Sequence, residues 1–275
     1  ARLSARRTTV VVDASPPPVA GASFNAHAST LAFELTSGRR PIIVNCGSGR
    51  SFGEDWRRAG RATPSHATLG IEGYSSSRLG PANEGLAGGP EILIDRPKSV
   101  HCETKLLPAA RRVELSHDGF VPTHGLTHAR ILDVANDGRG IIGEDVLTTL
   151  TEDQNNRFAR ALDATNLQGI PFAVRFHLHP DVDAKLDLGG TAVSLALKSG
   201  EIWVFRFDGI GKLDLKPSVY LENGRLKPRP SQQVVLSGRT MAYATRVRWS
   251  LAKAQDTPEG VRDLVTDDPL EPFNE

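Results

Sequence analysis

The chain has 275 residues, 39% of them hydrophobic, which is enough to bury a sizeable core as one large or two small domains. Its two cysteines exclude a disulfide framework, and no run reaches the roughly 18 apolar residues that a membrane-spanning helix needs. The formal net charge is +1, but residues 1–250 hold 31 basic and 25 acidic groups, a net charge of +6. The net positive charge of residues 1–250 favours a negatively charged binding partner.

The chain begins with a strand-like run over residues 8–12, which is β-branched throughout. Three prolines at 16–18 end this strand, because proline cannot donate a ladder hydrogen bond. Three further runs, at 23–35, 41–47 and 65–73, have strand-like composition and carry polar residues among apolar neighbours. Alternate residues of a strand share a face. We therefore expect Asn25 and His27 to point the same way, beside Asn45 and His66 if the runs pair.

Arginines concentrate between positions 39 and 61, where Glu54 and Asp55 are the only acids. The planar fork of arginine matches carboxylate and sulfate groups. Arg57, Arg58 and Arg61 are therefore candidate substrate-binding residues for a polyanion. A solvated loop rim is an equal alternative.

The remaining chain alternates short strand-like runs with turn signals such as Asp118-Gly119. The only helix predicted lies over 151–165, where Thr151 and Gln154 form a capping-box pattern. We interpret His117, His124 and His128 as exposed loop histidines, because no acidic residue stands at ligand spacing.

The stretch from Ser23 to Gly73 resembles the heparinase II/III family of polysaccharide lyases, in the part that follows the family's helical toroid. The family pattern runs His-x-His, a Ser-Phe-Glu-Leu-like strand, a Gly-Arg turn, an apolar strand ending Asp-x-Gly-Thr, and an Arg-Ser-Thr-x-x-His-Asn-Thr segment. The resemblance rests on the order and spacing of five pieces. These are residues 25–27, 31–35, 38–39, 45–48 and 61–68.

The resemblance implies roles for four residues. The first histidine of the family pair takes part in elimination, and Asn25 stands at that position as the candidate catalytic residue. The second histidine, the aspartate and the later histidine hold a metal ion, and these positions are His27, Asn45 and His66. Zinc suits two imidazoles, but a neutral amide is a poorer ligand than a carboxylate. We therefore expect a weakened zinc site.

A dozen or more short strands with at most one short helix predict an all-β fold, a large antiparallel two-sheet β-sandwich. The resemblance implies the same "super-sandwich" architecture. We expect residues 1–250 to form this domain and residues 251–275 to form a disordered acidic tail.

The resemblance implies β-elimination across a uronic-acid glycosidic bond, in substrates such as glycosaminoglycans. In the family, the helical toroid supplies the acid/base tyrosine. We therefore expect a lyase C-terminal domain that is inactive without the missing N-terminal toroid of the same protein. The alternative is a catalytically silent carbohydrate-binding or structural β-sandwich.

The expected partners are an acidic polysaccharide and the toroid, with neither nucleic acid nor a membrane span. Because the chain begins at Ala1 and has no signal-like segment, we expect a piece of a longer protein. The resemblance implies a periplasmic or cell-envelope location, and a cytoplasmic one stays open.

Overall fold

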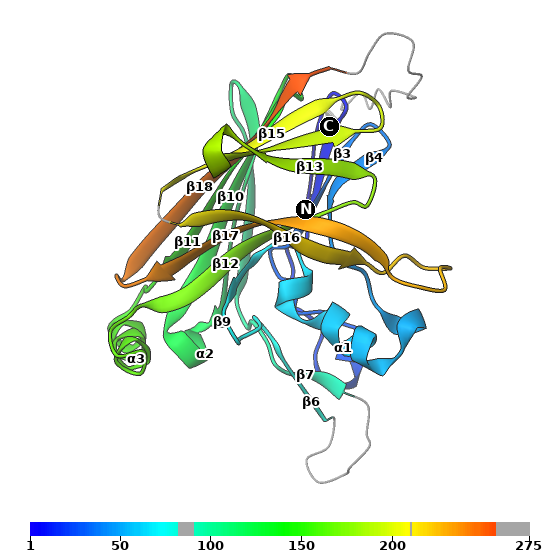
Figure 1. The fold of residues 1–275 in the computed structure, drawn as a ribbon. Helices are drawn as coiled ribbons and strands as arrows, with labels where there is room; N and C mark the ends of the chain where they lie inside the picture. Colours follow the sequence, from blue (N-terminus) through cyan, green and yellow to red (C-terminus); the bar gives the residue numbers. More distant parts are fainter. Residues whose placement is uncertain (82–90, 210, 257–275) are drawn as a thin grey trace, which may run out of the picture.

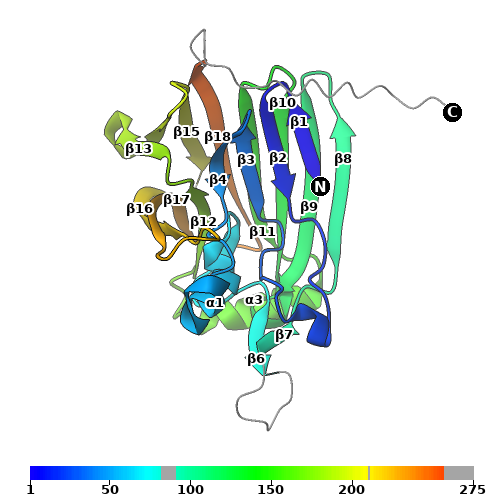
Figure 2. The same ribbon diagram turned by 90° about the vertical axis from the view of Figure 1, so that its right-hand side faces the viewer.

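The computed structural model describes residues 1–81, 91–209 and 211–256, and two large antiparallel β-sheets dominate it (Figure 1). Strands β1 to β4 lie in front of β9 to β11 in Figure 2, so the sheets form two layers. The predicted antiparallel β-sandwich is confirmed. Within the described ranges, no helix is long and apolar enough to span a bilayer.

The first sheet has eight strands in the order β1-β2-β3-β4-β12-β17-β16, with β5 paired to β12. Its central strand β12 joins segments far apart in the sequence, because it pairs with β4, β5 and β17. The strands are β1 (Arg2–Ala5), β2 (Thr8–Val12), β3 (Phe33–Ser37), β4 (Arg40–Val44), β5 (Leu69–Ile71), β12 (Ile170–Leu178), β16 (Lys212–Tyr220) and β17 (Arg229–Thr240).

The second sheet also has eight strands, in the order β13-β14-β15-β18-β11-β10-β9-β8. On β18, Val247, Trp249 and Leu251 are buried while Arg246 and Arg248 are exposed, as alternation across a half-buried strand requires. The strands are β8 (Val100–Leu106), β9 (Ala110–Phe120), β10 (Leu126–Ala135), β11 (Gly140–Thr148), β13 (Val182–Asp187), β14 (Ala192–Leu197), β15 (Ile202–Gly209) and β18 (Ala244–Gln255).

Three α-helices are present in the described residues, so the expectation of at most one is wrong. The predicted helix is α3, where the side chain of Thr151 accepts a hydrogen bond from the Gln154 N–H. A two-stranded hairpin, β6 with β7, lies below the sandwich in Figure 1. The bounds are α1 (Glu54–Arg61), α2 (Val121–His124), α3 (Glu152–Asp163), β6 (Arg78–Pro81), β7 (Glu91–Asp95), and the 3-10 turns η1 (Ala20–Ser23), η2 (Arg50–Phe52), η3 (Thr63–Ser65) and η4 (Leu188–Gly190).

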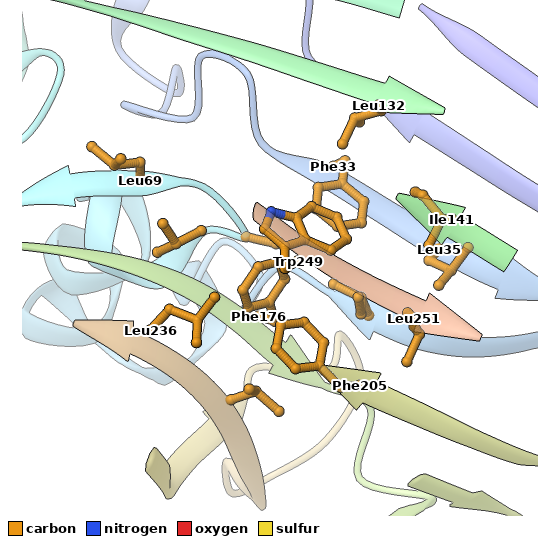
Figure 3. Close-up of a cluster of buried hydrophobic side chains, with 14 of the residues drawn as sticks. Phe33, Leu35, Leu69, Leu132, Ile141, Phe176, Phe205, Leu236, Trp249 and Leu251 are labelled. Carbon is orange, nitrogen blue, oxygen red and sulfur yellow. The ribbon is translucent and has the colours of Figure 1, made fainter. Parts of the chain in front are cut away.

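Aromatic side chains from both sheets form the centre of the core (Figure 3). Phe33 of β3 stacks on Trp249 of β18 with ring centroids 5.6 Å apart. Phe176 of β12 meets the same indole edge-on at 4.7 Å. Such contacts between large apolar rings hold the two layers together.

Strand β18 continues to Gln255, past the boundary expected at residue 250. Most of the acidic tail predicted from residue 251, namely residues 257–275, lies outside the described residues.

Candidate functional site

Two histidines that are 39 residues apart in the sequence meet in the structure. His27 Nδ1 lies 3.2 Å from His66 Nε2, and the ring centroids are 5.1 Å apart. His66 is only 3% exposed, and its Nδ1 is buried with no hydrogen-bond partner in the described part of the chain. His27 is half-buried. The pair therefore joins an enclosed imidazole to one that reaches the surface.

Neither histidine lies on a strand, so the expectation of a shared strand face for Asn25 and His27 is wrong. His27 lies between η1 and β3, and His66 directly follows η3. The η1 turn closes through the Ser23 hydroxyl, and Leu31 has a left-handed φ of 64°, which extended strands do not adopt. Long-range packing, rather than strand periodicity, brings the imidazoles together.

Helix α1 fixes the backbone on both sides of Asn25. Arg61 Nε donates to the Ala26 carbonyl at 2.8 Å, and Arg57 Nη2 donates to the Phe24 carbonyl at 2.6 Å. The Arg57 guanidinium also lies 4.3 Å from the centroid of the Phe24 ring. Both arginines are mostly buried, and they hold this segment in place.

The sequence contained a signal for α1 that the strand-based interpretation missed. Glu54 and Asp55 occupy its first turn and Arg61 its last, an order that complements the helix dipole. Gly60 allows the helix to approach the end of β4, because a Cβ there would lie 2.6 Å from the Gly47 carbonyl oxygen. Close packing of α1 thus depends on glycine at that position.

Asn45 follows β4 and ties it to the turn that carries His66. Its Oδ1 accepts a hydrogen bond from the Ala67 N–H at 2.9 Å, and its Nδ2 donates to Glu34 Oε1 at 3.1 Å. A cavity of about 350 Å³ is lined by Asn45, Glu34 and both imidazoles. The structure therefore brings the three predicted metal ligands to one cavity, with the Asn45 amide already hydrogen-bonded at both ends.

A second cavity of about 590 Å³ adjoins the first, and His27 lines both. Its wall is polar and basic, and three arginines from η2 and α1 contribute to it. Its lining includes Asn25, His27, Arg50, Arg57, Arg61 and Asn223.

Burial keeps both imidazoles neutral at pH 7. It lowers the pKa of His27 below the ordinary value, and the positive charge of Arg61 lowers it further. Complete burial lowers the pKa of His66 well below its usual range, and the neighbouring His27 and His177 add to this effect. A neutral imidazole has a lone pair that can accept a proton or bind a metal.

The predicted arginine set is divided between two cavities. Arg57 and Arg61 line the cavity of Asn25 and His27, whereas Arg58 lines a different one. Arg58 has a 63% exposed side chain and pairs with Glu91 at 3.3 Å.

His117, His124 and His128 are 2%, 8% and 0% exposed, so the prediction of exposed loop histidines is wrong. His117 Nε2 lies 3.3 Å from His128 Nδ1, and His128 Nε2 lies 2.8 Å from Asp145 Oδ1. The missing acidic partner thus comes from the neighbouring strand β11, which sequence spacing could not show.

Arg130 and Asp145 form a fully buried ion pair that supports the site from the second sheet. Arg130 Nε donates to Asp145 Oδ1 at 2.8 Å, while its Nη1 donates to the carbonyls of Leu31 and Ala67 at 2.8 and 2.9 Å. Burial alone would raise the pKa of Asp145, but Arg130 and His128 hold that pKa well below its usual range. Arg130 thus anchors two turns of the first sheet.

The distance between the two imidazole nitrogens suits a zinc ion, but the third expected ligand, Asn45, suits it less well. Two nitrogens about 2.0–2.1 Å from a tetrahedral zinc lie roughly 3.3 Å apart, close to the 3.2 Å between His27 and His66. The Asn45 oxygen already accepts from Ala67, and zinc usually takes three or four protein ligands. Across the described ranges, no group of three or more His, Cys, Asp or Glu side chains could hold a metal.

The sequence matches the family described as Heparinase II/III-like, C-terminal, over residues 1–250. A curated relative, FtsZ-localized protein C of Caulobacter vibrioides, is 32% identical over 254 residues, covering 90% of this chain and 41% of that protein. The chain therefore spans less than half the length of this relative.

Two solved structures are similar in fold. Heparan sulfate lyase HepC from Pedobacter heparinus is 14% identical with a TM-score of 0.64, over 91% of this chain and 34% of that one. A crystal structure of heparinase III is 16% identical with a TM-score of 0.62, over 90% of this chain and 33% of that one. In both, the shared part is a β-sandwich of this architecture and the remaining two thirds has no counterpart in this sequence.

Proposed function

Because the chain belongs to the Heparinase II/III-like, C-terminal family, as its sequence pattern predicted, we propose that it is the β-sandwich part of a lyase that cleaves uronic-acid-containing polysaccharides. The observation that carries this proposal is the neutral His27–His66 pair beside a cavity bordered by Arg50 and Arg57. A neutral base and a basic wall are what elimination next to a sugar carboxylate requires.

In the proposed step, His27 removes the proton on the carbon beside the uronate carboxylate. Its Nδ1 faces His66, so Nε2 is the nitrogen that takes the proton. The electron pair forms the new carbon–carbon double bond and expels the glycosidic oxygen, which leaves with a proton from a general acid. The Asn25 amide and the Arg50 guanidinium neutralise the carboxylate, where negative charge develops.

We propose that the general acid comes from an N-terminal helical toroid outside this sequence. Within the described residues, no tyrosine lines either cavity that His27 borders. The chain covers only 34% of the HepC structure. This partner domain would close the open side of the site.

The test is the rise in ultraviolet absorbance from unsaturated uronate on a panel of heparan, chondroitin and alginate. The 275-residue chain alone should give no turnover, while the longer protein should cleave one polymer. His27→Ala should abolish that activity, and His101→Ala, at an exposed position of β8, should preserve it. Turnover by the 275-residue chain alone would contradict the need for a second domain.

We also propose that His27 and His66 bind zinc weakly, with Asn45 as a poor third ligand. This is supported by the 3.2 Å separation between the facing nitrogens and by the lowered pKa values that keep both imidazoles neutral. The proton transfer above uses the metal-free pair. Dialysis against zinc should load less than one ion per chain, and His66→Ala should release it and lower the melting temperature. Zinc content no higher than in His66→Ala would refute the site.

A catalytically silent glycan-binding sandwich is the second candidate, favoured by Asn25 at the position of the family's eliminating histidine. The name of the relative, FtsZ-localized protein C, states that it is localised by FtsZ. The corresponding proposal for this chain is that it binds glycan without cleaving it, at the site in the cell where FtsZ is found. Retention on heparin resin without turnover by the longer protein would favour this candidate.

A further inference from the structure

A cavity of about 900 Å³ lies against a different face of α1 from the histidine pair. Asp55, Arg58 and Ala59 of α1 line this cavity, whereas Arg57 and Arg61 line the histidine cavity. Its other walls come from the segment before β6, the end of β7, and α2, and Figure 1 shows the β6–β7 hairpin between α1 and α2. Its volume is within the range of small-molecule sites, about 300–1,000 Å³.

Two of the four basic residues at this cavity are neutralised by acids. Arg78 Nε lies 2.7 Å from Asp95 Oδ2, and Arg58 Nε lies 3.3 Å from Glu91 Oε1. These exposed pairs leave little net charge behind.

The other two basic residues, Arg96 and Lys98, have no carboxylate partner among residues 1–81, 91–209 and 211–256. Arg96 Nη1 donates to the Pro97 carbonyl at 3.2 Å, and the other guanidinium donors have no hydrogen-bond partner within the described ranges. Lys98 is exposed. The nearby carboxylate of Asp118 accepts instead from the backbone N–H groups of Lys98 and Ser99. Two lining cations without a carboxylate partner in the described residues favour an anionic group in this cavity.

Three consecutive serines, Ser75 to Ser77, line the cavity. Ser75 and Ser76 are hydrogen-bonded to Thr63. Ser77 is 2% exposed, lines the cavity, and its Oγ has no partner in the part of the chain that the structure describes. An unpaired buried hydroxyl is unfavourable, and native proteins usually satisfy such groups with a protein partner, water or a ligand.

Tyr74 adds an aromatic surface to the same cavity. Tyr74 is 49% exposed. Its ring contacts the imidazole of His124 in an edge-to-face arrangement, with the ring centroids 4.6 Å apart. A half-exposed aromatic ring beside hydroxyls and cations offers an apolar contact next to polar ones.

We propose that this cavity binds one acidic sugar residue, separately from the His27–His66 site. Arg96 and Lys98 bind its carboxylate, the Ser77 hydroxyl binds a ring hydroxyl, and Tyr74 contacts the apolar face of the ring. The class of ligand rests on the proposed function, but the site itself needs no lyase activity. The β-sandwich then has a second binding site for an acidic glycan.

The test is a titration of the isotope-labelled 275-residue chain with sodium glucuronate, followed by backbone amide resonances. The amides of Ser75, Ser77 and Lys98 should shift and saturate, and glucose at equal concentration should leave them unmoved. Equal shifts with glucose, or with sodium phosphate, would overturn the assignment of an acidic sugar.

Two variants separate binding from folding. Ser77→Ala removes an unpaired hydroxyl, so it should keep or raise the melting temperature while weakening glucuronate binding severalfold. Lys98→Ala should weaken binding about tenfold, and Lys185→Ala, which removes an exposed charge on β13, should not. Undiminished binding by Ser77→Ala and Lys98→Ala would overturn this site. If His27→Ala still abolished cleavage by the longer protein, the proposed function would stand.

Discussion

The molecule contains two imidazole pairs of nearly the same geometry in different surroundings. In the pair His27–His66 the facing nitrogens are 3.2 Å apart, and in the pair His117–His128 they are 3.3 Å apart. The ring centroids are 5.1 Å apart in both. The first pair borders two cavities, while the second is enclosed between the sheets.

The difference lies in what completes each pair. His128 has Asp145, which is itself paired with Arg130 and accepts from the Trp249 indole at 3.0 Å. His66 has a buried Nδ1 without a partner in the described residues. The buried pair belongs to a hydrogen-bonded network of charged groups, whereas the His27–His66 pair borders two cavities. Partners and access, rather than the distance between imidazoles, distinguish the pair that we propose to be functional from the pair in the core.

The largest expected effect is a loss of stability in acid, shared by both pairs. Burial lowers the pKa values of His66, His117 and His128, and lowers that of His177 to about 4. Below pH 6.5 the unfolded chain binds protons that the folded chain excludes. Between pH 6.5 and its own folded-state pKa, each such histidine should therefore remove about 1.4 kcal/mol per pH unit from the free energy of unfolding.

Urea unfolding at pH 7.5, 6.5, 5.5 and 4.5 measures this slope, which should be flat at the top of the range and steep below pH 6.5. His66→Gln should reduce this slope by about 1.4 kcal/mol per pH unit, which is the contribution of one proton. Constant stability down to pH 4.5 would mean that these imidazoles are accessible to protons in the fold.

The second effect concerns the buried ion pair alone. Arg130→Met should lower the free energy of unfolding by about 3–5 kcal/mol, because it leaves Asp145 buried without its cation. The matched control is Arg112→Met on β9, whose pair with Asp133 at 2.7 Å is partly exposed and worth about 1 kcal/mol or less. Equal losses in the two variants, measured by urea unfolding, would argue against a structural role for the buried network.

The third effect separates two neighbouring arginines of α1. Arg57→Ala should cost about 1.5–3 kcal/mol, because it removes a charged hydrogen bond to the Phe24 carbonyl. Arg58→Ala, at an exposed position, should stay within about 0.5 kcal/mol. Thermal unfolding of both variants measures the two losses in stability. A larger loss for Arg58→Ala than for Arg57→Ala would contradict the prediction.

Arg57 and Arg58 also allow a test of the prediction that this region binds a polyanion. Replacing both with alanine should weaken retention on heparin resin and flatten its salt dependence, because surface attraction is screened at high ionic strength. Unchanged elution would show that these two arginines do not bind the polyanion.

The β-sandwich was predictable because alternating burial and turn residues recur along most of the chain. The meeting of His27 and His66 followed from the family pattern and not from strand periodicity, since both lie in irregular segments. Helix α1 was missed because it is only eight residues long and its composition is strongly polar.

The buried network could not be predicted, for a different reason. Asp145 reaches His128 and Arg130 across neighbouring strands, and Arg130 reaches Ala67 across the two sheets, 63 residues away. Single-sequence patterns report local periodicity and not such pairings. A histidine without a nearby acid in the sequence can still have one in space.

The most direct test of the central claim follows the imidazole resonances of the 275-residue chain during addition of a hexasaccharide of alternating glucuronate and N-acetylglucosamine. If His27–His66 is the functional pair, the resonances of His27 and His66 should shift and saturate while those of His117 and His128 stay in place. Unmoved resonances of His27 and His66, or shifts confined to the buried pair, would contradict this account.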